Sequence, residues 1–211
     1  ILGLPYETTE DAAGIGELAE KMADVYFGIP KDVRNKGLKI TVSTSILVPK
    51  PFTPFQWAPM ARPEIVDERI KAVRGAIKSR SIVYNYHEQE TSFMEAVFAR
   101  GDRRTCDVLI KAFEKGAKFD GWSEYFNMEI WNEAMEECNL DSEFYVYRER
   151  EYDEILPWDF IDIGVNRKYM ERENEKAKKA ELTKNCLEGC TGCGINVNFK
   201  EGKCFEGAIR N

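Results

Sequence analysis

The first sixty residues alternate between the periodicities of strands and helices. Residues 1–5 have the pattern of the end of a buried strand, with leucines on either side of a glycine and a proline after them. Thr8 and Asp11 form a capping-box pattern before residues 9–26, whose apolar side chains recur at helical spacing. Residues 38–48 then alternate between apolar and small polar side chains, as a strand does. A strand, a helix and a strand in this order form a βαβ unit, so we predict that the two strands are parallel.

The polar face of residues 38–48 carries Thr41, Ser43 and Ser45. In a (β/α) barrel this face points into the lumen, and small polar residues there suit a lumen that holds a ligand. The alternative is an edge strand whose polar face meets solvent. Periodicity favours these two arrangements equally.

A stiff, aromatic-rich segment, residues 49–57, follows at the carboxyl end of this strand. Loops at that end of α/β barrels carry the functional site. Lys50, Thr53 and Gln56 are therefore candidates for substrate contacts. The alternative is a rigid loop without such a role.

Helices dominate the pattern beyond residue 60. The isolated Cys106 and Cys138, and the four tryptophans, are expected in the core. The predicted elements are a helix opened by Pro63, a short strand over residues 81–86, helices near residues 90–100, 103–116 and 123–138, and a charged, solvent-exposed helix near residues 165–182.

His87 is a candidate general acid or base, and the alternative is a surface histidine. Because it is the only histidine, a mechanism that needs two imidazoles from this chain is excluded.

Composition and charge limit the function classes. Hydrophobic residues make up 43% of the 211 residues, which is typical of a folded domain rather than a disordered chain. The net charge of −7 argues against a general nucleic-acid-binding surface, because neutralising phosphates requires a basic face. No apolar run reaches the length that spans a bilayer, so we expect no membrane partner. Cysteines spaced for ligation rather than for disulfides indicate a reducing compartment, and we predict the cytoplasm.

Three cysteines lie close together near the end of the sequence. Cys186, Cys190 and Cys193 have the spacing CxxxCxxC, and Cys204 is a candidate fourth ligand. Four thiolates suit either Zn²⁺ or an iron–sulfur cluster, and the spacing does not separate the two. The alternative is a tail of free thiols. We predict a metal site.

Residues 3–11, Gly-Leu-Pro-Tyr-Glu-Thr-Thr-Glu-Asp, resemble the Gly-Leu-Pro-x-Glu-Thr-x-Glu-Asp segment of radical S-adenosylmethionine (SAM) enzymes. In that superfamily the segment follows the fifth barrel strand and passes along the adenine part of SAM. The resemblance implies that Gly3, Leu4 and Pro5 border the SAM pocket. It also makes Ser43 and Ser45, on the inner face of the next strand, cofactor-binding candidates.

Residues 42–57 look like the sixth barrel strand of the same superfamily, in particular of the branch whose members carry an upstream cobalamin-binding domain. Residues 100–104 and 155–162 are similar to the downstream part of one largely uncharacterised subfamily of that branch. The resemblance covers most of the chain and is most specific in the first sixty residues. It implies an α/β fold in which the last strands of a radical SAM partial (β/α) barrel precede a mainly helical subdomain.

The resemblance further implies an enzyme that cleaves SAM reductively and directs the 5′-deoxyadenosyl radical at an unknown substrate. Its cofactors would be SAM, a [4Fe-4S] cluster and, from the subfamily, cobalamin. Its partners would be an electron donor such as flavodoxin or ferredoxin, and an upstream part of the same polypeptide. The family binds its catalytic cluster on CxxxCxxC after the first barrel strand, but here that spacing, at residues 186–193, has only eighteen residues after it. We therefore expect the catalytic cysteines upstream of Ile1, and this chain alone to be inactive.

Three regions follow from these patterns. We predict the C-terminal part of the barrel at residues 1–60, a mainly helical subdomain at residues 61–182 and a cysteine-rich metal-binding tail at residues 183–211. The tail would hold a second iron–sulfur cluster or zinc. A different class of function stays open, in which the chain is a non-catalytic zinc-binding module that contacts RNA or a partner protein.

Overall fold

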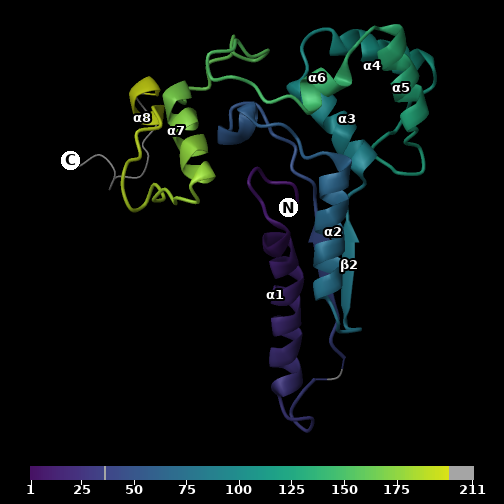
Figure 1. Ribbon diagram of the computed structural model, residues 1–211, viewed down its shortest axis with the longest axis vertical. Coiled ribbons are helices and arrows are strands. Elements are labelled where there is room, and N and C mark those ends of the chain that lie inside the picture. The colour runs from purple at the N-terminus through teal and green to yellow at the C-terminus, as the bar shows by residue number, and fades with distance from the viewer. Residues whose placement is uncertain (36, 200–211) are drawn as a thin grey trace.

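The computed structural model describes residues 1–35 and 37–199 and shows a mixed arrangement of helices and strands (Figure 1). Within these residues two strands form a parallel sheet, and the helices α1 and α2 lie side by side next to it. Helices α3 to α6 gather at one end of this unit, and α7 and α8 form a group on the other side. In chain order the elements are α1 (Thr9–Gly28), β1 (Ile40–Thr44), the 3₁₀ helix η1 (Pro54–Trp57), α2 (Pro63–Ala76), β2 (Ile82–Tyr86), α3 (Gln89–Arg100), α4 (Thr105–Glu114), α5 (Met128–Glu137), α6 (Ser142–Val146), α7 (Arg167–Lys178) and α8 (Ile195–Asn198).

The start of α1 is fixed by the predicted capping box. The Thr8 hydroxyl accepts a hydrogen bond from the Asp11 amide at 3.1 Å, and the Thr8 amide donates to the Asp11 carboxylate at 2.9 Å. Two amide groups that the helix itself cannot satisfy are thereby paired. The Thr8 amide and hydroxyl both donate to the Asp11 carboxylate, and these two bonds lower the pKa of the Asp11 carboxyl. The predicted helix and its cap are confirmed.

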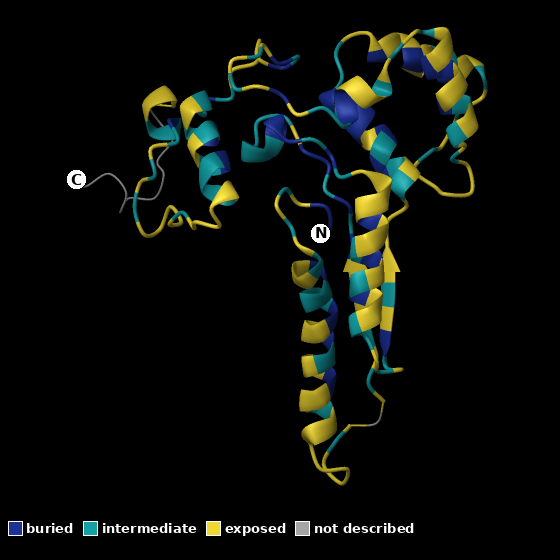
Figure 2. Cartoon of the chain, in the orientation of Figure 1, coloured by how far each residue is buried: buried dark blue, intermediate teal, exposed yellow. Residues whose placement is uncertain are grey.

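Helix α1 packs on α2 through small side chains rather than large ones. Ala12, Gly16 and two further alanines are buried in α1. Figure 2 shows that the buried side of α1 is the one that faces α2 and the sheet. A Cβ at Gly16 would lie 2.6 Å from the Val73 carbonyl oxygen, so the two backbones approach too closely for a larger residue. Ile15 of α1 packs against the main core, but most larger apolar residues of the helix point to solvent, and Val25 is 74% exposed. The exposed apolar stripe consists of Leu18, Met22 and Val25.

The strands pair in parallel, as predicted for residues 1–5 and 38–48. β1 pairs with β2 in a register that sets Ile40 against Ile82, and Leu2 forms a parallel bridge with Ile46. The Leu2 amide donates to the Ser45 carbonyl at 2.8 Å, and the Leu47 amide donates to the Leu2 carbonyl at 2.8 Å. β1 therefore spans five residues rather than the predicted eleven, because the chain changes its pairing partner after Thr44 from β2 to the segment around Leu2.

The two faces of the sheet differ in their surroundings. Ile40 and Val42 pack with Ile82 against α1, in a cluster with two of its alanines. The other face of β1, with Thr41 and Ser43, is exposed in this structure. The structure thus shows a layer of helices on one side of a short parallel sheet. A partial barrel requires further strands, and it stays a prediction.

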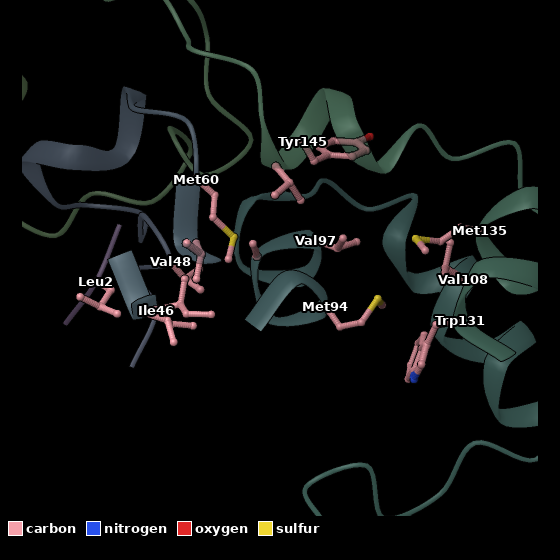
Figure 3. Packing of buried hydrophobic residues seen from close by; sticks show 14 of the residues in the cluster. Leu2, Ile46, Val48, Met60, Met94, Val97, Val108, Trp131, Met135 and Tyr145 are labelled. Carbon is pink, nitrogen blue, oxygen red and sulfur yellow. The ribbon is translucent and has the colours of Figure 1, made fainter. Parts of the chain in front are cut away.

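One hydrophobic core joins the sheet end to the helical part (Figure 3). It runs from Leu2 and Ile46 past Met60 and Val97 to Trp131, so that α3, α4 and α5 are anchored to the strand ends. The short α6 was not predicted from the sequence; its first turn is capped by the Asp141 carboxylate, which accepts from the Phe144 amide at 3.1 Å. Among the described residues, no helix combines the length and the hydrophobicity that crossing a bilayer requires.

Some sequence-based expectations for side-chain burial are wrong. Cys106, expected in the core, is exposed on α4, and Trp122 is exposed in the loop before α5. The other three tryptophans are buried, as predicted. The charged helix α7 is shorter than predicted and is not wholly solvent-exposed, because Met170 and Asn174 are buried in it. Met170 packs in a small second core with Trp57, Leu156 and Trp158.

Candidate functional site

The candidate site is a cavity of about 450 Å³ beside the turn that precedes α1. Its volume lies in the range of small-molecule sites. The turn residues Gly3, Leu4 and Pro5 form one wall, and the segment that follows η1 forms the opposite wall. The remaining lining comes from α2 and from the segment after α6. Besides the three turn residues, the cavity is lined by Tyr6, Glu7, Ala58, Pro59, Met60, Ala61, Arg62, Ile65, Arg69, Tyr147 and Glu149.

Gly3 adopts a backbone conformation that favours glycine. Its φ is +79°, in the left-handed region, and a Cβ there would lie 3.0 Å from the Cβ of Ala61. The Gly3 amide donates to the Glu7 carboxylate at 2.8 Å, which closes the turn. The sequence at this position therefore permits both the turn and the close approach of the two walls.

An ion pair fixes the turn to α2. The Arg69 Nε lies 3.6 Å from Glu7 Oε2, and the two side chains are only 12% and 7% exposed. Arg69 also donates from Nη2 to the Glu7 carbonyl oxygen at 2.9 Å, and it contacts the Thr9 hydroxyl. A mostly buried, multiply hydrogen-bonded pair holds its geometry better than an exposed one does. The cavity wall is thus a rigid one.

The cavity combines flat apolar groups with a few polar ones. Tyr6 is 53% exposed and Tyr147 is half-buried; partial desolvation raises the pKa of both hydroxyls, which are protonated and can donate hydrogen bonds at neutral pH. The Arg62 guanidinium lies 4.7 Å from the centre of the Tyr147 ring and 3.4 Å from Glu143. Glu149 adds a second carboxylate to the lining. Flat apolar walls with nearby carboxylates suit a nucleoside, whose base stacks and whose hydroxyls donate.

Ser43 and Ser45 are not part of this cavity. Ser43 lies on the exposed face of β1, paired in register with Asn85. Ser45 is half-buried, and its carbonyl oxygen accepts from the Leu2 amide. The structure therefore places these two candidates on the strand next to the cavity wall rather than in the lining. Between them, the Thr44 and Tyr84 hydroxyls form a hydrogen bond of 2.9 Å, and burial raises the pKa of Tyr84.

The three substrate candidates after β1 have different surroundings. Lys50 is exposed and forms an ion pair with Glu95 of α3. The Thr53 hydroxyl donates to the Lys50 carbonyl at 2.8 Å, which is a turn contact. Gln56 is 2% exposed, and its Oε1 accepts from the Trp158 Nε1 at 2.7 Å and from the Phe52 amide at 3.0 Å. Gln56 thus joins two distant segments in this structure, and it also lines a cavity of about 260 Å³ beside α7.

The cysteine segment folds back onto α7. Cys186 and Cys190 are exposed, Cys193 is half-buried, and Cys204 lies outside the described residues. Among residues 1–35 and 37–199, no three Cys, His, Asp or Glu side chains converge on a point where they could hold a metal. The Asn166 amide donates to the Cys193 carbonyl at 2.8 Å. The three glycines between and after the cysteines, Gly189, Gly192 and Gly194, all have positive φ.

Sequence reasoning missed two functional features. The contact of Glu7 with Arg69 joins residues 62 positions apart, although the glutamate belongs to the motif that identified the turn. Arg100 and Arg150 are buried and donate to backbone carbonyl groups, with Arg100 Nε 3.0 Å from the Tyr145 oxygen. No periodicity marks such residues, because they hold irregular segments. His87, in contrast, is exposed, as the surface alternative predicted.

Comparison of the chain with protein-family models, with curated proteins and with solved structures gave no match. The function of the chain is therefore inferred from the residues and the geometry of the site.

Proposed function

We propose that this chain forms part of a radical SAM enzyme and that the cavity beside Gly3 holds the adenosine part of SAM. One observation carries the proposal. The three residues that the sequence resemblance assigns to the SAM pocket, Gly3, Leu4 and Pro5, line one cavity of suitable size at the end of a parallel strand pair. In open and closed parallel sheets, ligands bind at the carboxyl ends of the strands.

In this proposal the chain binds and orients SAM, and a group that this chain does not hold supplies the redox chemistry. A reduced [4Fe-4S] cluster, held by cysteines outside this sequence and fed by flavodoxin or ferredoxin, would supply the electron that cleaves SAM. The Gly3 turn offers an apolar wall to the base, and the Glu7 and Arg69 pair keeps that wall in place. Cobalamin and a cytoplasmic location belong to the same proposal, through the subfamily resemblance and the reduced thiols.

Two uncovered surfaces support a barrel. The face of β1 that carries Thr41 and Ser43 is exposed, and so is the apolar stripe of α1. In a (β/α) barrel the first surface would line the lumen, and the second would pack against a neighbouring helix of the outer ring. One architecture thus accounts for both exposures.

The test is a titration of the chain with SAM that is monitored through the amide NMR signals of residues 3–7. We expect millimolar SAM to shift these signals. Ile65→Trp should abolish the shifts, because the indole fills the cavity that Ile65 lines from α2. Leu109→Trp is the matched control, since Leu109 is a helical residue of similar exposure, 51% against 44% for Ile65, outside the cavity lining. Unshifted signals in the unmodified chain, or equal shifts in both variants, would contradict the proposal.

The same proposal predicts that the isolated chain does not cleave SAM. No 5′-deoxyadenosine should appear when the chain is incubated with SAM and dithionite, whereas its release would show that the catalytic cysteines lie within this sequence. Chromatography of the reaction mixture decides between these outcomes.

We further propose that Cys186, Cys190 and Cys193, with Cys204, bind a second iron–sulfur cluster or zinc. Contacts with α7 hold the segment: Arg172 donates to the Thr191 carbonyl at 2.6 Å, in addition to the Asn166 contact. A brown anaerobic preparation that bleaches with dithionite would indicate iron. A colourless protein with stoichiometric zinc would favour the non-catalytic module that contacts RNA or a partner protein, and a metal-free protein would contradict both. Cys106→Ser is the control for replacement of the clustered cysteines.

A further inference from the structure

A larger cavity, of about 830 Å³, lies where three segments far apart in the sequence meet. The first segment, residues 51–52, follows β1, the second, residues 101–104, joins α3 to α4, and the third spans residues 157–161. None of these residues belongs to the lining of the cavity beside Gly3. The two cavities are therefore separate sites.

The wall of the larger cavity is mainly apolar and partly rigid. Its apolar lining includes Phe52, Trp158, Phe160 and Ile161. Trp158 is buried and held by the hydrogen bond from its Nε1 to Gln56. Phe160, in contrast, is 85% exposed. An exposed phenylalanine at the mouth of an apolar cavity is typical of a ligand-binding surface.

The charges at the rim do not cancel. Arg103, Arg104 and Asp102 line the cavity, which makes two cations against one anion. Asp102 is already paired, because it accepts from Arg104 Nη2 at 2.7 Å and from the Tyr145 hydroxyl at 2.9 Å. Arg103 has no side-chain hydrogen bond or ion pair with any described residue. One guanidinium is therefore free to pair with a ligand.

Two further cations lie behind the wall. Arg100, which lies between the wall residues Ala99 and Gly101 in the sequence, is buried, and the Arg150 guanidinium lies 5.5 Å from the centre of the Trp158 ring. Both arginines donate to backbone carbonyls, and no carboxylate pairs with them among the residues that the structure describes. Arg100 Nη2 and Arg150 Nη1 have no partner there. Uncompensated charges in a low-dielectric interior act over longer distances than exposed ones do, so they favour an anion in the cavity.

We propose that this cavity binds a small molecule that has an apolar ring body and one anionic group. The apolar body would pack on Phe52, Trp158 and Phe160, and the anionic group would pair with Arg103. The rim carries this local excess of positive charge although the whole chain has a net charge of −7. The inference does not rest on the proposed SAM chemistry.

The experiment compares two fluorescent probes that share one apolar body. 8-Anilinonaphthalene-1-sulfonate carries a sulfonate, and N-phenyl-1-naphthylamine is the same molecule without it. We expect the anionic probe to bind about fivefold to tenfold more tightly, as one partly desolvated charge pair implies. We also expect its affinity to fall with added salt, whereas that of the neutral probe should not.

Variants locate the site. Arg103→Gln should remove most of the preference for the anionic probe, and Phe160→Ser should weaken the binding of both probes. Lys118→Gln and Phe113→Ser are the matched controls, because Lys118 Nζ lies 5.8 Å from the centre of the exposed Phe113 ring at a place outside the cavity lining. Equal binding of the two probes to the unmodified chain would overturn the inference. So would equal effects of the Arg103 and Lys118 variants.

Discussion

The unit of α1, α2 and the sheet differs from the segments around Gln56 in how buried polar groups are satisfied. In the first region, helices and strands pair their own backbone groups, and small residues such as Gly16 let the elements pack closely. In the second region the chain is irregular, and buried side chains donate to backbone carbonyls, as Arg100 and Arg150 do. Buried backbone groups need partners in either case. In irregular segments the buried backbone groups therefore depend on individual polar side chains for their hydrogen bonds, whereas in helices and strands they pair with one another.

The largest expected effect is in the irregular region. Arg100→Met would leave the carbonyl groups of Pro49 and Gln56 without the donor that now lies 3.3 Å and 3.5 Å away. Each unsatisfied carbonyl costs about 1–3 kcal/mol, and loss of the buried charge offsets part of this, so we expect a net loss of about 2–3 kcal/mol. Urea denaturation measures this loss. Arg80→Met, at an exposed position, should change the free energy of unfolding by less than about 0.5 kcal/mol.

A smaller loss is expected in the regular region. Gly16→Ala places a Cβ 2.6 Å from the Val73 carbonyl oxygen and 2.8 Å from the Ala76 Cβ, so the two helices must separate. We expect a loss of about 1–3 kcal/mol, as for overpacked cores. Gly14→Ala is the matched control, because nothing lies within 4 Å of its added Cβ. It should raise the free energy of unfolding by about 0.5–1 kcal/mol through helix propensity. Equal effects of the two variants would mean that the helices do not touch at Gly16.

The third prediction concerns pH. Hydrogen bonds from Arg104 hold the pKa of the Asp102 carboxyl well below its usual value of 3.8. The folded protein therefore binds fewer protons than the unfolded chain just below pH 4, and the stability that this carboxylate contributes is lost as the pH falls through that range. Asp102→Asn should cost about 1 kcal/mol at pH 7 and flatten the fall in stability between pH 4 and pH 2. Asp32→Asn, at an exposed position, should leave the pH dependence unchanged.

The smallest effect is expected on the exposed apolar stripe of α1. Val25→Ser should change the free energy of unfolding by less than about 0.5 kcal/mol, because Val25 is already largely in water. Calorimetry at two protein concentrations checks this. A loss above about 1 kcal/mol that grows with concentration would show that a second copy of the chain covers the stripe.

The sequence allowed prediction of those parts of the fold that rest on local patterns. The capping box of Thr8, the helix after it and the parallel direction of the strands follow from spacing and chain order. The buried face of α1 could not be predicted in this way, because α1 packs closely on its neighbours through its small residues rather than through most of its large ones. The length of β1 could not be predicted either, because the chain pairs with β2 up to Thr44 and with the segment around Leu2 after it.

The candidate site shows the same limit. The Gly3 turn was predicted from a motif, but its opposite wall comes from residues 58–62, which no local pattern links to it. Gln56 was predicted as a substrate contact because it follows a strand. That prediction stays untested, but in the structure the Gln56 Oε1 accepts from Trp158, 102 positions away, and only the folded chain brings these two residues together.

The bridge at Leu2 has a consequence for hydrogen exchange. Its amide and carbonyl groups are both bonded to the segment around Ile46, and its side chain is buried in the core, so releasing either group also removes Leu2 from that core. The Leu2 amide should therefore exchange with deuterium far more slowly than the amide of the exposed Tyr6. One amide signal would then report the opening of this strand end.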